Sequence, residues 1–136
     1  MLRISPTRIR RQRGQSLLET ALMIVVIFNV VFWVFELGWL MYTYSVMADA
    51  ANEGVRYAIV HSGGDSGGAK TRVAIFAGTS LHNVSAISTS VTFPDGSSAP
   101  PNRVRVTVSY TYVPWLTHFI NTPTMTTYAE GRMIVP

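Results

Sequence analysis

The sequence predicts an α+β protein, in which a long N-terminal transmembrane helix continues outside the membrane and precedes a small antiparallel β-sheet of about three strands. Three observations predict this order. Residues 21–40 are almost entirely apolar, residues 42–60 lack proline and are rich in alanine, and residues 103–113 alternate apolar and polar side chains. A helical region followed by a strand-rich region, without alternation of the two, is typical of α+β folds.

The first fourteen residues form a basic leader. It contains no acidic residue and five arginines, namely Arg3, Arg8, Arg10, Arg11 and Arg13. From residue 15 onward, six Lys and Arg stand against seven Asp and Glu, so the overall charge of +4 arises in the leader. Basic residues beside an apolar run are typical of the cytoplasmic flank of a membrane segment. A nucleic-acid-binding arm normally joins a soluble domain, so we expect no nucleic-acid partner.

The apolar run of residues 21–40 is interrupted only by Asn29, Glu36 and Gly38. A helix of twenty residues covers about 30 Å, the thickness of the hydrocarbon layer of a bilayer. Such a run fits a buried core helix, a cleaved secretory signal with its site near residues 48–50, or an uncleaved anchor. The rest of the chain is too short to wrap a core helix, and secretory signals have apolar regions of only about 7–15 residues. An anchor is favoured, with its membrane part near residues 17–41 and its N-terminus in the cytoplasm.

The helix is expected to continue outside the membrane, so that it occupies residues 15–60. Mostly small side chains recur there at three- and four-residue steps, which gives one face of the helix a small-residue stripe: Met47, Ala50, Ala51, Gly54, Val55 and Ala58. Such a stripe permits close packing, either on a helix of another protein or on the sheet of this chain. A Gly/Ser linker at residues 61–69 is expected to end the helix.

Residues 70–136 are expected to form a small, β-rich exterior domain. Residues 70–77 fit a short helix or a strand equally well, whereas residues 83–93, 103–113 and 124–135 fit strands. A turn-rich loop at residues 94–102 makes the first two strands antiparallel neighbours. A second loop is apolar, and its side chains fit a partner surface, the membrane interface or a cover for the core: Trp115, Leu116, Phe119 and Ile120.

No pattern of catalytic or metal-ligating residues emerges. The three histidines, His61, His82 and His118, fall in different loops without metal-ligand spacing. The chain has no cysteine, which excludes disulfides and thiolate metal sites. We therefore expect a protein that is not an enzyme and needs no cofactor or metal.

Two motifs at opposite ends of the expected helix resemble a known family. The leader ends in Gly14, and Glu19 follows five residues later at the start of the apolar run. The outer end carries Glu36-Leu37-Gly38 and then the segment AANEGVRYA, which includes Glu53, Gly54, Arg56 and Tyr57. Together these motifs resemble prepilin-like signal-anchored proteins, and within them the TadE-like pseudopilins of tight-adherence (Flp, type IVc) pilus systems.

The resemblance implies how the protein is matured, what its role is and where it is located. The leader would be held in the cytoplasm by four arginines, namely Arg8, Arg10, Arg11 and Arg13. A prepilin peptidase would then cut after Gly14 and leave Gln15 as the mature N-terminus. The product would be a minor, non-catalytic subunit in the assembly of an adhesive bacterial pilus. It would cross the inner (cytoplasmic) membrane once, with its C-terminal domain outside, and its partners would be other pilins, pseudopilins and the assembly platform. The alternative is a signal-anchored envelope protein whose exterior domain binds a ligand or partner.

Glu19 has a physical role in this interpretation. An unpaired carboxylate in lipid costs about 2.5–3.5 kcal/mol, so it favours a cationic partner. The α-amino group that cleavage creates on Gln15, in the same subunit or a neighbour, is the nearest candidate. Mispaired subunits would keep an unpaired charge, which would make assembly selective for register.

Overall fold

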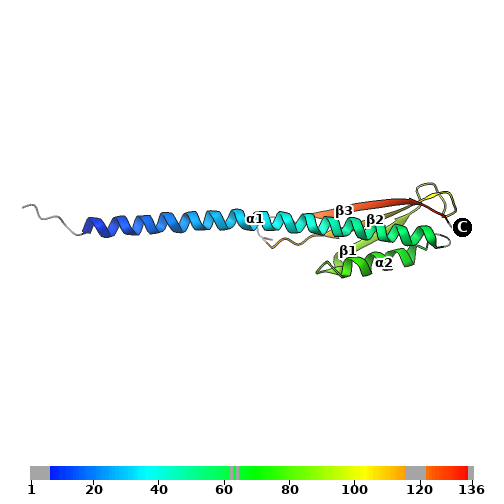
Figure 1. Ribbon diagram of the computed structural model, residues 1–136, viewed down its shortest axis with the longest axis horizontal. Helices are drawn as coiled ribbons and strands as arrows, with labels where there is room; N and C mark the ends of the chain where they lie inside the picture. The colour runs from blue at the N-terminus through cyan, green and yellow to red at the C-terminus, as the bar shows by residue number, and fades with distance from the viewer. Residues whose placement is uncertain (1–6, 62, 64, 116–121, 135–136) are drawn as a thin grey trace, which may run out of the picture. The chain divides into compact units, whose positions relative to one another are not determined.

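The computed structural model describes residues 7–61, 63, 65–115 and 122–134, with side chains from residue 14 onward. Two helices, α1 (Thr7–Val60) and α2 (Ser66–Gly78), come first along the chain. A short 3₁₀ turn, η2 (Val84–Ala86), leads into three strands: β1 (Ile87–Thr92), β2 (Arg103–Thr111) and β3 (Thr124–Arg132) (Figure 1). The predicted α+β class, with one long helix and a three-stranded antiparallel sheet, is confirmed.

The chain divides into two compact units, Met1–Gly38 and Trp39–Pro136. The first unit contains the N-terminal part of α1. Its large apolar side chains are exposed on every face of the helix: from Leu17 to Phe35, each is more than 40% exposed. A helix that is apolar all round belongs in an apolar solvent or in a core, and no described residue of this unit provides a core.

The second unit has two layers. One layer is the three-stranded sheet, in the order β1-β2-β3. The other contains the C-terminal part of α1 together with α2, both on the same face of the sheet (Figure 1). The core between the layers combines small side chains of the two helices with alternate residues of the central strand, of which Val104, Val106 and Val108 are fully buried.

The register of the sheet follows the two-residue alternation of β2. Val106 lies opposite Val91 of β1 and Ala129 of β3, and all three side chains face the helices. The next residues along β2 point to the other face, which is polar and partly exposed. The predicted strand with alternating apolar and polar side chains is therefore confirmed.

The start of α2 differs from the sequence-based expectation. A linker was expected over residues 61–69, but α2 begins at Ser66 and includes the whole of residues 70–77, so that segment is helical. The physical cause is a cap: Asp65 accepts hydrogen bonds from the backbone N–H groups of Gly67 and Gly68, at 3.1 and 3.0 Å. Burial of Ala69, Val73 and Ala77 then holds the helix against the core in spite of its glycines.

The strands on either side of the loops are shorter than expected. β1 begins at Ile87 because the 3₁₀ turn occupies residues 84–86, and β3 ends at Arg132. Of the apolar loop, Leu116, Phe119 and Ile120 lie outside the described residues, whereas Trp115 is described and is 87% exposed.

Candidate functional site

The expected processing region lies within α1. Gly14 and Gln15 are exposed helical residues, and a Cβ added to Gly14 would have no heavy atom within 4 Å. Residues 8–13 continue the same helix toward the N-terminus, but the side chains of Arg8, Arg10, Arg11 and Arg13 lie outside the described residues.

Glu19 is exposed on the same helix. Its one hydrogen bond in the described part of the chain comes from the side-chain amide of Gln15, with Nε2 3.4 Å from Oε1. At that distance the bond is weak. No Lys or Arg whose side chain is described forms an ion pair with Glu19, so its charge is not neutralised within this part of the chain.

The apolar part of α1 is long and apolar enough to cross a membrane, and none of its most apolar 18-residue window is buried inside the protein. At its outer end, Gly38 has no neighbour within 4 Å of an added Cβ, and Glu36 is only 7% exposed. The two motif residues Glu36 and Gly38 thus stand in different surroundings although they are one helical half-turn apart.

Gly54 is a position of close approach. A Cβ there would lie 2.7 Å from Cγ2 of Val73 and 3.2 Å from Cγ1 of Val106. Glycine therefore lets α1 touch both α2 and β2 at one point. Ala50, Ala51 and Ala58 of the same face are fully buried. Of the two interpretations of the small-residue stripe, packing on the chain's own sheet and second helix is the one that the structure contains.

Tyr57 joins the end of α1 to the start of α2. Its ring stacks on that of His61 with centroids 3.8 Å apart, and the guanidinium of Arg72 lies 5.7 Å from its centroid. An added Cβ at Gly68 would collide with the ring. The remaining motif residues, Glu53 and Arg56, form an exposed ion pair at 3.8 Å on the outer face of the helix. Within the segment Glu53–Tyr57, Gly54 and Tyr57 thus have packing roles.

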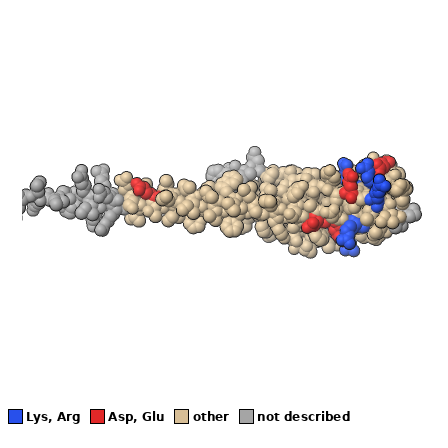
Figure 2. Space-filling model, turned by 45° about the horizontal axis from the view of Figure 1, so that its top comes forward, with Lys and Arg blue, Asp and Glu red and all other residues tan. Residues whose placement is uncertain are grey.

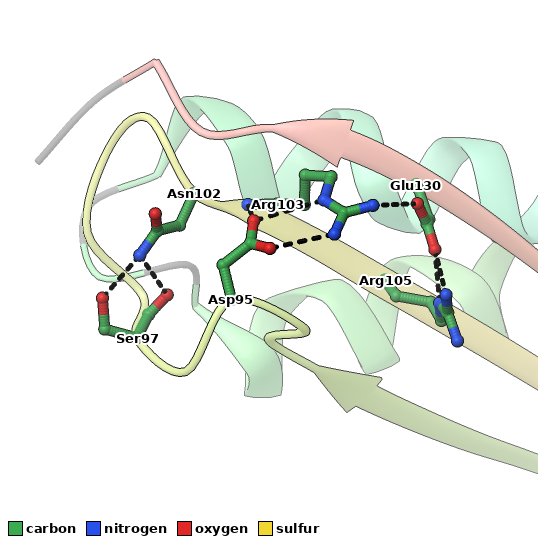
Figure 3. A network of polar contacts seen from close by, with 6 residues as sticks. All are labelled: Asp95, Ser97, Asn102, Arg103, Arg105 and Glu130. Atoms are coloured by element: carbon green, nitrogen blue, oxygen red, sulfur yellow. Dashed lines mark hydrogen bonds and ion pairs between the residues drawn. The ribbon is translucent and has the colours of Figure 1, made fainter.

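A charged network, which sequence reasoning missed, closes the β1–β2 loop (Figure 3). The guanidinium of Arg103 donates to both carboxylate oxygens of Asp95, at 2.9 and 3.2 Å, and the backbone N–H of Arg103 donates to the same carboxylate at 2.8 Å. Glu130 of β3 links Arg103 to Arg105, and Arg105 also lies over the ring of Tyr128. The signal in the sequence was the shared parity of Arg103, Arg105 and Glu130 on the wet faces of adjacent strands.

This network sets the charge of Asp95. The side-chain and backbone hydrogen bonds from Arg103 stabilise the carboxylate and lower the pKa of Asp95 from 3.8 to about 2. The carboxylates of Asp95 and Glu130 correspondingly raise the pKa of Arg103. These groups are partly exposed and are joined by hydrogen bonds and ion pairs. Their contacts hold the β1–β2 loop against the start of β2.

Comparison with known proteins places the motifs in a family context. The family model described as TadE-like protein matches residues 14–56, from the expected cleavage residue to the ion pair of Glu53 and Arg56. Neither the curated proteins nor the solved structures yielded a match. The match ends two residues before Ala58 and covers the apolar helix together with most of its packed extension. Residues 14–56 of this chain are therefore similar to that family, as the sequence motifs predict.

Proposed function

We propose that this protein is a minor pseudopilin, a non-catalytic subunit in the assembly of a tight-adherence (Flp) pilus. The observation that carries the proposal is the position of the exposed apolar helix, which lies between the start of the family match and the packed unit. The TadE-like match begins at Gly14, and the helix that follows exposes apolar side chains all round until the packed unit starts at Trp39. Such a chain has one segment suited to a membrane or to a bundle of similar helices, and a second segment that folds around its own core.

Maturation by a prepilin peptidase after Gly14 is part of the proposal. The chain would be held in the inner membrane with its basic leader in the cytoplasm and its C-terminal unit outside. Cleavage removes the leader arginines and leaves Gln15 with a free α-amino group. The peptidase, other pilins and the assembly platform are its partners in this scheme.

The test is the N-terminal residue of the protein recovered from membranes. The wild-type chain is expected to start at Gln15, and Gly14→Ala is expected to start at Met1. Because Gly14 is exposed with free space around it, alanine fits there and even favours a helix by about 1 kcal/mol. Lost cleavage in this variant therefore reports recognition by the peptidase and not a folding defect.

Other N-termini would contradict the proposal. A wild-type chain that starts at Met1 in membranes indicates the signal-anchored envelope protein with an exterior binding domain. A chain that starts at Ala51 in the soluble fraction indicates a secreted protein.

The charge of Glu19 provides a separate test of assembly. Glu19→Ala is expected to leave cleavage largely intact but to reduce the number of pili, because the variant cannot pair with the α-amino group of a neighbour. Thr20→Ala is the matched control: it removes a polar side chain at almost the same depth, one that donates only to Ser16 within the helix. Normal piliation of Glu19→Ala, counted by electron microscopy, contradicts the charge-pairing mechanism.

A further inference from the structure

Contacts within the second unit show in which direction β2 runs along α1. Val106 of β2 lies beside Gly54 of α1, and Gly131, the partner of Val104, lies beside Val55 and Ile59. β2 therefore runs toward the lower-numbered residues of the helix. From Val106, the five further residues to the end of β2 at Thr111 cover about 17 Å, as do about eleven helical residues, so the end of β2 is level with about residue 43 of α1.

Charge is distributed unequally along this direction. Residues 39–48, 73–94 and 106–129 contain no Lys, Arg, Asp or Glu. These ranges include the start of the helix in this unit, the end of β2 and most of β3. Figure 2 shows the charged side chains of the unit gathered toward its other end. The charged residues of the unit are Asp49, Glu53, Arg56, Asp65, Lys70, Arg72, Asp95, Arg103, Arg105, Glu130 and Arg132.

The end of the second unit without charges exposes large apolar and aromatic side chains. We call this region the uncharged end. These side chains come from two segments that are far apart in the sequence: Trp39, Met41, Tyr42 and Tyr44 of α1, and Val113 and Trp115 after β2. Each is at least 45% exposed, and Trp115 is 87% exposed. The rings of Trp39 and Tyr42 lie together, with centroids 5.5 Å apart.

Exposed tryptophan and tyrosine without neighbouring charges match the chemistry of a membrane interface. Their rings combine apolar area with a polar N–H or O–H, and they concentrate at the headgroup level of bilayers. A charged side chain that entered the acyl chains just below the headgroups would have to be desolvated, and the described residues of the uncharged end include none. The helical part of the end also follows directly on residues 21–38, which are apolar except for Asn29, Glu36 and Gly38.

We propose that the uncharged end rests in the headgroup layer of the bilayer that α1 crosses, so that Val113 and Trp115 form a second lipid contact beside the helix. The proposal rests on the membrane anchor of the proposed function. Two contact points, one on α1 and one after β2, would fix how the exterior unit stands on the membrane before assembly. Its polar sheet face and charged network would then face water.

The test uses the full chain in vesicles of phosphatidylethanolamine and phosphatidylglycerol, with and without brominated acyl chains. The chain has three tryptophans, so Trp33→Phe with Trp39→Phe leaves Trp115 as the sole reporter. The matched control carries all three Trp→Phe changes together with Tyr128→Trp, at an exposed site on the sheet. A third variant, Trp39→Phe with Trp115→Phe, reports on Trp33 within the anchor.

Trp115 is expected to lose fluorescence in brominated vesicles and to resist quenching by aqueous acrylamide. The control indole at position 128 is expected to do the opposite. Acrylamide quenching of Trp115 as strong as that of the control overturns the proposal. So does protection from acrylamide without quenching by brominated lipid, since that result indicates contact with a second copy. The Trp33 variant separates the two hypotheses, because failure of the lipid to quench Trp33 overturns the anchor itself.

Discussion

The two parts of α1 belong to one helix of 54 residues, yet they are built for different surroundings. Before Gly38, the helix exposes Leu, Ile, Val and Phe on all faces. After Trp39, one face carries small residues that are fully buried against α2 and the sheet. The backbone is the same in both parts, so side-chain size and distribution alone separate a segment suited to lipid from one suited to a close-packed protein core.

The largest expected difference concerns truncation of a large side chain in each part. Met47 is fully buried, so Met47→Ala is expected to lower the free energy of unfolding of the second unit by about 2–5 kcal/mol. Phe28 is 59% exposed, and Phe28→Ala is expected to leave that free energy unchanged. Denaturant titration of the full chain in detergent micelles, followed by near-ultraviolet circular dichroism, measures both. Equal losses in the two variants would show that the two parts do not differ in packing.

A smaller difference is expected between two glycines of the same helix. Gly54→Ala places a Cβ against Val73 and Val106, so we expect a loss of about 1–3 kcal/mol from overpacking. Gly38→Ala meets no atom within 4 Å and is expected to leave the stability of the second unit unchanged. The same titration compares them. Full stability of Gly54→Ala would mean that α1 and α2 separate easily, and that the contact at Gly54 does not define the unit.

The sequence predicted those features that depend on local pattern. The apolar run and the alternation of β2 each extend over many residues, and such long patterns identify a helix and a strand without knowledge of the rest of the fold. Residues 70–77 were too short a pattern to separate helix from strand, and the cap by Asp65 that begins α2 at Ser66 was hidden among glycines and serines. The partners of Gly54 could not be predicted, because its contacts come from α2 and β2.

The candidate site divides in the same way. Gly14, Glu19 and the motif around Gly54 were recognisable because their spacing along one helix is the signal, and the family match covers residues 14–56 of that helix. The network of Asp95, Arg103 and Glu130 depends on strand register and on the path of a loop, which sequence parity alone does not specify. The alternation of side chains along the strands indicated only that the charged residues would face water.

The smallest expected effect is electrostatic and belongs to the charged end of the second unit. The pKa of Asp95 is lowered from 3.8 to about 2, so the carboxylate stabilises the folded state above pH about 4, and this contribution disappears as the pH falls toward 2. Asp95→Asn is expected to flatten the loss of stability between pH 4 and 2, as measured by unfolding titrations at a series of pH values.

Asp49→Asn is the control for the Asp95 variant, because Asp49 is exposed and forms no ion pair with any described residue; it should keep the wild-type slope. Since the Asp95 network is partly exposed, the difference between Asp95→Asn and wild type should also shrink in high salt. If the difference between Asp95→Asn and wild type does not depend on salt, the network of Asp95 is not exposed to solvent as the structure shows.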